Sequence, residues 1–213
     1  MNPSPPTRAT PGRPRRREDA EILEAALHAF AMVGYDAMSV RALNAELGLS
    51  HETIGRRFGT KRQLYDAAFA HGLADLYVAM AAAGEGRAAP QDDVEELRET
   101  VRTFIVAAAA RPDLGRLVNQ EGLVASDRLD HLIRVGFADG TAVLVELLDR
   151  LTAAGTIHRT SARELFFLAQ AGAAPFTMQP LSAAFDAVDG PLDAALHVER
   201  VTDLIVRGLL VRP

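Results

Sequence analysis

Apolar side chains recur at helical spacing along almost the whole chain, and the alternation that is typical of strands is nearly absent. In the first such stretch Ile22, Ala26 and Phe30 fall on one face of a predicted helix over residues 17–33. Gly34 follows at the position where a glycine commonly ends a helix. An all-α fold is therefore predicted, because apolar helix faces are buried by packing helix on helix.

Capping residues and turn residues divide the rest of the chain into further helices. Ser39 and Ser50 are good N-caps, and Thr60 with Gln63 forms a capping box. Pro191 suits the first turn of the last helix. The nine helices expected cover residues 17–33, 40–47, 51–57, 60–83, 92–110, 112–122, 126–154, 161–178 and 191–211. Residues 179–190 are expected to form a loop.

Composition excludes several classes of protein. The 213 residues include no cysteine, which excludes disulfides and thiolate metal sites and agrees with a reducing cytoplasm. No run approaches the roughly 18–20 apolar residues of a membrane span, and no apolar core follows the N-terminal arginines as in a secretory signal. We therefore expect a cytoplasmic protein with no membrane partner.

No set of residues suggests catalysis. The sequence has no glycine-rich phosphate loop, no cysteine nucleophile and no histidine pair at metal-ligand spacing. His51 stands beside Glu52 but lacks an activated serine partner. We expect no enzyme activity, no metal and no cofactor.

Charge is divided unevenly along the chain. Residues 1–63 hold ten Lys/Arg and seven Asp/Glu, a net +3, whereas residues 64–213 hold 13 and 21, a net −8. This asymmetry is typical of a nucleic-acid-binding end joined to a body with another task, although arginines clustered by chance in a solvated tail would give the same numbers. The expected division is a disordered basic tail over 1–16, a helix-turn-helix domain over 17–63 and a helical body over 64–213.

The second and third predicted helices, with Gly48 in the turn between them, have the spacing of a helix-turn-helix. If Ile54 and Phe58 point inward, Glu52 and Arg56 point outward, flanked by Thr53 and Gly55. Arg56 can fork onto guanine, Glu52 can accept from cytosine, and the Thr53 methyl can meet thymine. The alternative is that Glu52 and Arg56 form an ordinary ion pair on the helix surface.

Other side chains around the motif suit the phosphate backbone or an adjacent base. Thr60 and Lys61 begin a helix, where free backbone N–H groups and a lysine attract phosphate. The basic arm before the first helix can lie on the backbone or enter the minor groove, or can be a tail with diffuse attraction only. The full set of expected DNA-binding residues is Arg15, Arg16, Arg41, Asn44, His51, Glu52, Thr53, Gly55, Arg56, Arg57, Thr60 and Lys61.

The ordered set of these residues resembles the tetracycline-repressor-like (TetR) family of transcriptional regulators over roughly Glu21 to Phe69. The matching residues are Ile22-Leu23-x-Ala25-Ala26, Phe30, Gly34-Tyr35, Ser39-x-x-x-Leu43, Gly48-Leu49-Ser50, Ile54, Phe58 and Thr60-Lys61-x-x-Leu64. The helix count, the length and the segment Val198-Glu199-Arg200-Val201-x-x-Leu204 also look like this family.

The sequence departs from the family pattern at four positions. Gly55 stands where the family commonly has a tyrosine that touches phosphate, so that contact cannot be carried over to this chain. Arg57 replaces histidine or tyrosine, Asn44 a usual alanine and Arg62 a usual glutamate. Glycine within a helix also costs about 1 kcal/mol of stability against alanine. In place of the tyrosine contact, either Gly55 allows a closer approach to DNA or the neighbouring arginines supply the contact.

The resemblance implies that the helical body dimerises and binds a small effector. The last two helices have wide apolar faces, and a two-fold four-helix bundle would cover them, unless each face packs only on its own chain. The dimer-interface residues expected are Leu165, Ala169, Gly172, Leu196, Val201, Leu204, Ile205 and Gly208. The effector-binding residues expected are Phe104, Asn119, His131, Phe137, Phe167, Gln170 and Phe176, although each suits an ordinary core or surface position as well.

Together these features predict a ligand-responsive regulator of transcription. The leading hypothesis is a homodimeric repressor that binds a palindromic operator in double-stranded DNA and is released by a small molecule. Repression is the commoner behaviour of the family rather than something the residues specify. The alternative is a helical small-molecule-binding protein whose DNA-binding module is vestigial, and Gly55 keeps that alternative open.

Overall fold

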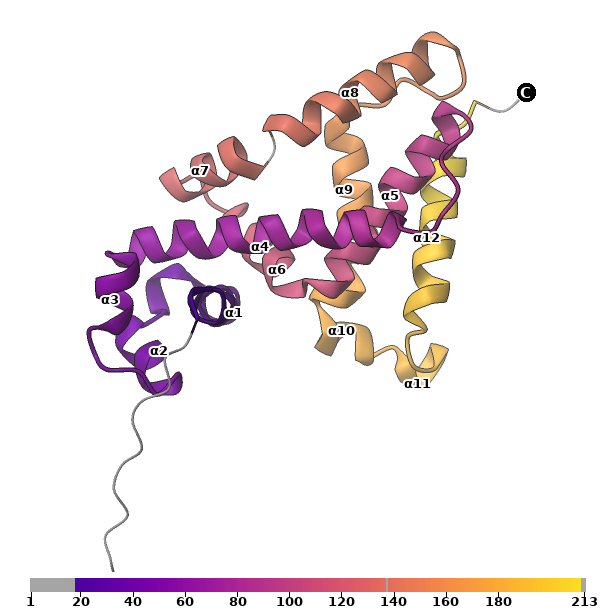
Figure 1. Cartoon of the computed structure of the whole chain (residues 1–213). Coiled ribbons are helices and arrows are strands. Elements are labelled where there is room, and N and C mark those ends of the chain that lie inside the picture. The colour runs from indigo at the N-terminus through magenta and orange to yellow at the C-terminus, as the bar shows by residue number, and fades with distance from the viewer. Residues whose placement is uncertain (1–17, 137, 212–213) are drawn as a thin grey trace, which may run out of the picture.

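The computed structural model describes residues 18–136 and 138–211, and within them every regular element is a helix (Figure 1). An isolated bridge joins Ile157 and Leu210. The prediction of an all-α fold is confirmed. The helices are α1 (Asp19–Ala37), α2 (Val40–Glu46), α3 (Thr53–Phe58), α4 (Lys61–Gly84), α5 (Asp93–Ala110), α6 (Pro112–Glu121), α7 (Asp127–Gly136), α8 (Ala138–Ala153), α9 (Ala162–Thr177), α10 (Gln179–Ala183), α11 (Asp186–Asp189) and α12 (Ala194–Leu209).

The described residues form twelve helices where nine were predicted. The expected helix over 126–154 is helical on both sides of residue 137, as α7 and α8, and residue 137 itself lies outside the described residues. The expected loop over 179–190 contains the short helices α10 and α11. The last helix begins at Ala194 rather than Pro191, because the Asp193 side chain accepts a hydrogen bond from the Leu196 N–H and caps it there.

Gly34 interrupts α1 where the sequence predicted an end. Its φ of 79° and ψ of 165° are not helical, and one further turn continues to Ala37. The Met38 N–H then donates to the Gly34 carbonyl at 3.2 Å. A left-handed φ suits glycine because glycine lacks a Cβ.

A first hydrophobic core joins α1, α2, α3 and the N-terminal half of α4 to α6 and α7. Aromatic rings lie at its centre, where Tyr65 meets Phe30 and Tyr35 at centroid separations of 5.0 and 5.3 Å. Leu114 and Leu117 of α6 and Leu132 of α7 are buried in the same cluster. The predicted boundary after residue 63 therefore falls within a packed core, and the division into domains stays a prediction.

A second core is formed by α5, α8, α9 and α12. Its buried residues include Leu97, Ile105, Leu147, Leu165 and Val206. Helix packing is close at Gly172 of α9, where an added Cβ would lie 2.6 Å from Val201 Cγ1 of α12. The missing side chain thus permits the approach of α9 to α12.

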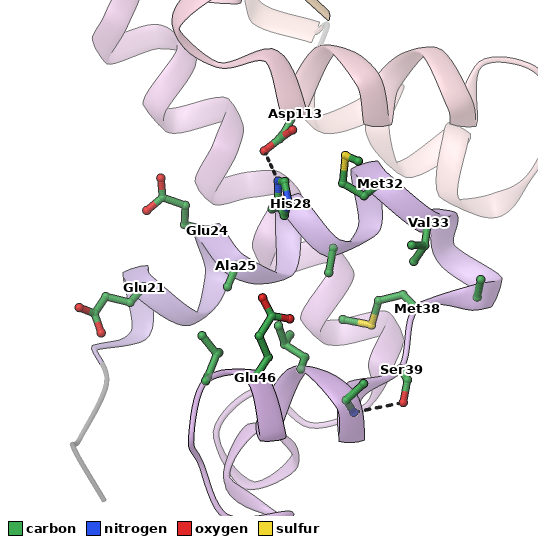
Figure 2. Close-up of a pocket in the computed structure, with 15 residues that line it drawn as sticks. Glu21, Glu24, Ala25, His28, Met32, Val33, Met38, Ser39, Glu46 and Asp113 are labelled. Atoms are coloured by element: carbon green, nitrogen blue, oxygen red, sulfur yellow. Dashed lines mark hydrogen bonds and ion pairs between the residues drawn. The ribbon is translucent and has the colours of Figure 1, made fainter. Parts of the chain in front are cut away.

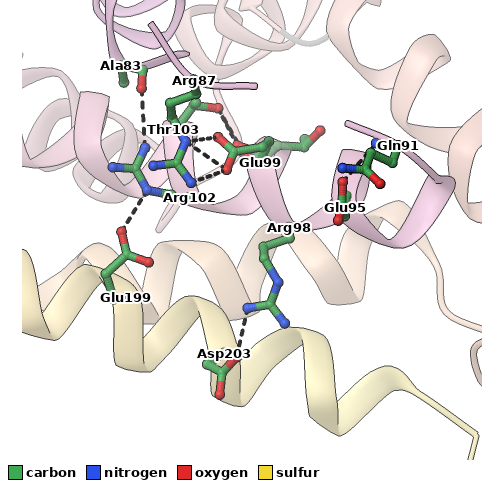
Figure 3. A network of polar contacts seen from close by, with 11 residues as sticks. Ala83, Arg87, Gln91, Glu95, Arg98, Glu99, Arg102, Thr103, Glu199 and Asp203 are labelled. Atoms are coloured by element: carbon green, nitrogen blue, oxygen red, sulfur yellow. Dashed lines mark hydrogen bonds and ion pairs between the residues drawn. The ribbon is translucent and has the colours of Figure 1, made fainter. Parts of the chain in front are cut away.

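Ion pairs on the surface of the second core join α5 to α12, and a hydrogen bond joins α5 to the end of α4 (Figure 3). Arg102 Nε donates to Glu199 Oε1 at 2.7 Å, and its Nη1 donates to the Ala83 carbonyl at 3.2 Å. Arg98 pairs with Asp203 at 2.7 Å one turn away. These contacts link the C-terminal end of α4 to the helical body.

Helix α4 runs from the first core to the second (Figure 1). It is the one helix among the described residues that is long and apolar enough to cross a membrane by length and composition. Leu64, Tyr65, Ala68 and Phe69 of this helix are buried in the first core, and α1 and α5 pack against it. A single helix with these neighbours is weak evidence for a membrane span.

Candidate functional site

Helices α2 and α3 meet across a tight turn as the sequence predicted. The Ser39 side chain accepts from the Ala42 N–H at 3.3 Å and caps α2, and Gly48 in the turn has a φ of 66°. Helix α3 begins at Thr53, two residues later than expected. Ser50 does not cap it, since its hydroxyl bonds the Thr53 hydroxyl at 2.7 Å while its carbonyl accepts from the Thr53 N–H at 3.0 Å.

Asn44 holds the two helices of this motif together from the inside. Its Nδ2 donates to the carbonyls of Val40 at 3.0 Å and His51 at 3.2 Å, and its Oδ1 accepts from the Ile54 N–H at 3.3 Å. The side chain is fully buried. The expectation that Asn44 touches DNA is wrong for this structure, because the amide is buried and forms its hydrogen bonds between α2 and the start of α3.

The outer face of α3 is open to solvent. Ile54 is buried and Phe58 packs against the same core, which fixes the helix with Gly55 and Arg56 outward. His51 and Glu52 are exposed in the turn before the helix, and Thr53 is half-buried.

Arg56 has no ion-pair partner among the described residues. The surface pair between Glu52 and Arg56 that the sequence allowed as an alternative is not among the ion pairs there, although the two residues share a backbone bond from the Arg56 N–H to the Glu52 carbonyl. Arg41, on α2, is likewise exposed. The motif therefore carries two exposed arginines, one on each of its helices.

The neighbouring cations are engaged within the chain. Arg57 pairs with Asp19 at the start of α1. Lys61 Nζ donates to the Asp36 carbonyl at 3.1 Å and lies 4.8 Å from the centre of the Tyr35 ring. A phosphate would have to compete with these contacts, which are exposed and therefore weak.

Thr60 opens α4 with the predicted capping box. Its hydroxyl accepts from the Gln63 N–H at 3.2 Å, and Gln63 Oε1 accepts from the Thr60 N–H at 2.8 Å. In this structure the Thr60 side chain is therefore an N-cap of α4.

Gly55 leaves an open space on the exposed face of α3. A Cβ built at this position would meet nothing within 4 Å. Gly55 is also helical, with no positive φ. The glycine is therefore not required by packing or by backbone conformation.

A buried polar cluster that sequence reasoning missed lies behind the motif, between α4, α6 and α7. Arg128 donates to Glu121 at 2.9 Å and stands 4.4 Å from the centre of the Tyr35 ring. Burial raises the pKa of the Tyr65 hydroxyl, and the nearby carboxylate of Glu121 raises it further. The hydrogen bonds from Arg128 to Glu121 raise the pKa of that guanidinium. No local pattern signals this cluster, because its members are brought together only by helix packing.

Residues 22–68, which include α2 and α3, match the family model described as bacterial regulatory proteins, tetR family. Over these residues the chain is similar to the tetR family. The match covers the helix-turn-helix and the first part of α4. No curated protein sequence matches the chain.

Solved structures extend the likeness to the whole tetR-family fold. HlyIIR, a haemolysin II transcriptional regulator, is 19% identical with a TM-score of 0.61 over 91% of this chain and 97% of that one. A TetR family transcription regulator from Marinobacter aquaeolei VT8 is 20% identical with a TM-score of 0.62 over 90% and 94%. A protein of unknown function from Rhodococcus sp. RHA1 is 22% identical with a TM-score of 0.59 over 93% and 100%. At these identities the likeness concerns the fold alone.

The predicted dimer-interface residues divide into two groups. Leu165, Ala169, Gly172 and Ile205 are buried within the chain itself, so these residues are not available to a partner in this structure. The apolar faces of α9 and α12 are wide enough that part of each packs on its own core. The other predicted interface residues are less buried. Leu196, Leu204 and Gly208 are exposed, and Val201 is half-buried.

Further exposed apolar residues on α9 were not predicted as interface residues. Phe167 is 64% exposed and Leu168 43% exposed, and Leu204 of α12 is 72% exposed. Ala171 and Met178 are also exposed at helical spacing from Phe167. We call Phe167, Leu168, Ala171 and Met178 the α9 stripe, and Leu196, Leu204 and Gly208 the α12 stripe.

The predicted effector-binding residues do not converge on one place. Phe104 of α5 lies 6.3 Å from Phe166, and Phe166 lies 5.4 Å from Phe167, between ring centroids. Gln170 donates to Asn119 at 3.4 Å.

The other predicted effector residues lie elsewhere. Phe176 is buried against the His197 ring, with a centroid separation of 5.5 Å. His131 stands 3.7 Å from Asp66 on the side of α4 that faces α7. Phe137 lies outside the described residues, as do Arg15 and Arg16 of the basic arm. His131 therefore forms a contact between α7 and α4 and does not lie beside Phe104.

Proposed function

We propose that the chain is a homodimeric, ligand-responsive regulator whose α3 helix reads base edges in the DNA major groove. The observation that supports this most strongly is the geometry of α3, whose inner side is fixed by Ile54 and by the Asn44 amide. Arg56 extends from its outer side with no ion-pair partner among the described residues. An arginine on the outer side of such a helix can donate two hydrogen bonds to guanine O6 and N7.

The other DNA contacts of this proposal come from the neighbouring residues. His51, Glu52 and Thr53 stand at the start of α3, where side chains of a recognition helix meet bases. Arg41, Arg57, Thr60 and Lys61 border the motif and would bind phosphate, the last three by leaving or sharing their present contacts. Gly55 would approach the DNA by its backbone alone. Arg15 and Arg16 would follow the backbone or the minor groove.

Dimerisation is proposed through the α9 and α12 stripes. Large apolar side chains exposed on helices of a packed body, such as Phe167 and Leu204, favour a partner surface. The same two helices of a second copy would form a two-fold four-helix bundle over them. Two copies of α3 would then face half-sites one helical turn, about 34–36 Å, or a multiple of it apart, so the operator would be palindromic.

The effector is proposed to bind in the helical body near Phe104, Phe167, Asn119 and Gln170. These residues supply aromatic surface and an amide pair on α5, α6 and α9. Helix α4 would transmit the effect, because it packs in the first core and its Ala83 carbonyl accepts a hydrogen bond from Arg102 of α5. A coupling of about 1–3 kcal/mol would weaken DNA binding about 5–150-fold and release a repressor.

The proposal is tested by a gel shift with the DNA upstream of the chain's own gene. We expect a discrete shifted band at physiological salt that unlabelled random DNA does not compete away. A helical small-molecule-binding protein with a vestigial DNA-binding module would give no specific shift, and that result would contradict the proposal. No catalytic activity is proposed.

A further inference from the structure

A groove of about 800 Å³ lies between α1 and α2, on the surface of the helix-turn-helix domain (Figure 2). Its apolar lining comes from α1, α2 and the segment that joins them, and includes Ala25, Met32, Val33 and Leu47. Met32 and Val33 are more than half exposed. The groove is thus an apolar surface that no described residue covers.

The lining of this groove carries only one sign of formal charge. It includes Glu21, Glu24, Glu46 and Asp113 and neither lysine nor arginine, with His28 beside Asp113 at 2.9 Å. An apolar surface with carboxylates around it attracts a segment that offers cations and apolar stems together.

Two of the acidic residues in the lining, Glu24 and Glu46, have weak ion pairing among the described residues. Glu24 is 71% exposed, and its contact with Arg111 is long at 3.8 Å. Glu46 is exposed and has no ion-pair partner among the described residues. Figure 2 shows its carboxylate turned from α2 toward α1 across the groove. Asp113, in contrast, already pairs with Arg116 at 2.7 Å.

We propose that the chain's own N-terminal arm, residues 8–17, docks in this groove. The arm contains five arginines (Arg8, Arg13, Arg15, Arg16 and Arg17) and no acidic residue, so its charge complements that of the lining. The arm lies outside the described residues, and it joins the described chain at Glu18, one residue before α1.

The arm is long enough to reach along the groove. Ten residues span up to about 33 Å when extended, whereas Glu21 to Val33 of α1 covers about 18 Å at 1.5 Å per residue. The arm would turn back near the start of α1 and run along that helix. Arginine stems would cover Met32 and Val33 while the guanidinium groups meet Glu24 and Glu46.

Docking gives the arm a regulatory role that rests on the proposed function. The same arginines are candidates for contact with the DNA backbone, and an arginine held by Glu24 or Glu46 is not available to phosphate. The groove would therefore hold the arm back from DNA, and DNA would have to displace it. Docking itself can be tested without DNA, which separates the two proposals.

Docking is tested with a spin label on the arm. The chain has no cysteine, so Thr10→Cys accepts a single nitroxide, and the label broadens the amide signals of nearby residues in a ¹⁵N NMR spectrum. We expect broadening along α1 as far as Met32 and along α2 around Ala42. The double variant Glu24→Gln/Glu46→Gln should remove most of it. Broadening confined to the first turn of α1, or unchanged in the double variant, would contradict docking.

Two controls make the result specific. Glu146→Gln/Asp149→Asn changes the same charge at exposed positions of α8 and should leave the broadening intact. A mixture of spin-labelled unenriched chain with unlabelled ¹⁵N-enriched chain reports only contacts between copies. Broadening in that mixture as strong as in the singly labelled sample would show that the arm binds a second copy, which would overturn docking within one chain.

The regulatory role is tested by affinity for random duplex DNA. Glu24→Gln/Glu46→Gln should tighten binding several-fold in the full chain, but much less in a chain whose five arm arginines are alanine. An equal gain in both backgrounds would be a general charge effect and would contradict competition between groove and DNA. If no variant binds DNA, the proposed function fails, whereas the NMR result still decides whether the arm docks.

Discussion

The side-chain amide of Asn44 bonds both helices of the helix-turn-helix and so sets their relative position. Its Oδ1 accepts from the N–H of Ile54, which lies in the first turn of α3 and has no partner within that helix. Its Nδ2 bonds carbonyls on α2 and in the turn. A buried amide with three such bonds supports the exposed residues of α3 without touching a ligand.

Asn44→Ala is therefore expected to destabilise the chain by about 1–3 kcal/mol, because it leaves a buried backbone N–H without a partner. Urea unfolding measures the change. Arg41→Ala on the exposed side of the same helix is the matched control and should stay within about 0.5 kcal/mol of the parent. A stability of the Asn44 variant equal to that of the control would show that the amide does not brace the motif.

Lys61 combines an internal contact with a predicted phosphate contact. Because a phosphate contact carries no sequence information, Lys61→Ala should weaken binding to operator and random DNA alike. It should also reduce the slope of log affinity against log salt by about 1. Titrations at several salt concentrations measure both. A loss restricted to the operator would assign Lys61 to base contact instead.

Helix α3 is short, and the glycine within it and the glycine just after it have opposite environments. Gly55 is exposed within the helix with open space at its Cβ position, whereas Gly59 after the helix has a φ of 79° and a Cβ position 2.2 Å from Gln63 Oε1. The first glycine costs helix stability for no structural reason. The second is needed for the turn into α4.

Gly55→Ala should accordingly raise the stability of the chain, by up to about 1 kcal/mol, through helix propensity. Gly59→Ala should lower it, because the new side chain is strained and disturbs the capping box of α4. Thermal unfolding of the two variants beside the parent gives the comparison. A melting temperature that falls in Gly55→Ala would mean that α3 needs glycine for a reason absent from this structure.

Local signals predicted the helices well because a cap depends on residues a few positions apart. The capping box of Thr60–Gln63 forms as expected. The small helices α10 and α11 have no comparable signal. The burial of Asn44 depends on contacts with His51 and Ile54 across the turn, which a family comparison by position does not reveal.

At the scale of the whole molecule, the sequence predicted wide apolar faces on the last two helices. It did not predict which residues of each face are buried within the chain and which stay exposed. Leu165 and Ile205 pack inside, while Phe167 and Leu204 remain exposed. Periodicity identifies the face, but the neighbouring helices decide its division. The predicted effector residues scattered for the same reason, since no local pattern indicates which aromatic residues converge.

Leu204→Glu should convert the proposed dimer to a monomer, because it places a charge in the apolar α12 stripe. Sedimentation velocity measures the mass, and operator affinity should fall with it because half-sites would be bound singly. Leu123→Glu is the matched control, since Leu123 is 82% exposed and lies outside both stripes. Dimers that survive Leu204→Glu would place the interface elsewhere.

The central claim, that α3 reads DNA bases, is tested most directly by Arg56→Ala. Fluorescence anisotropy would measure affinity for a duplex selected by the parent chain from a random pool and for a random duplex, with Arg163→Ala on α9 as an exposed control. We predict a loss of about 1–3 kcal/mol on the selected duplex and little change on the random one. Equal losses on both duplexes, or no loss on either, would contradict base reading by Arg56.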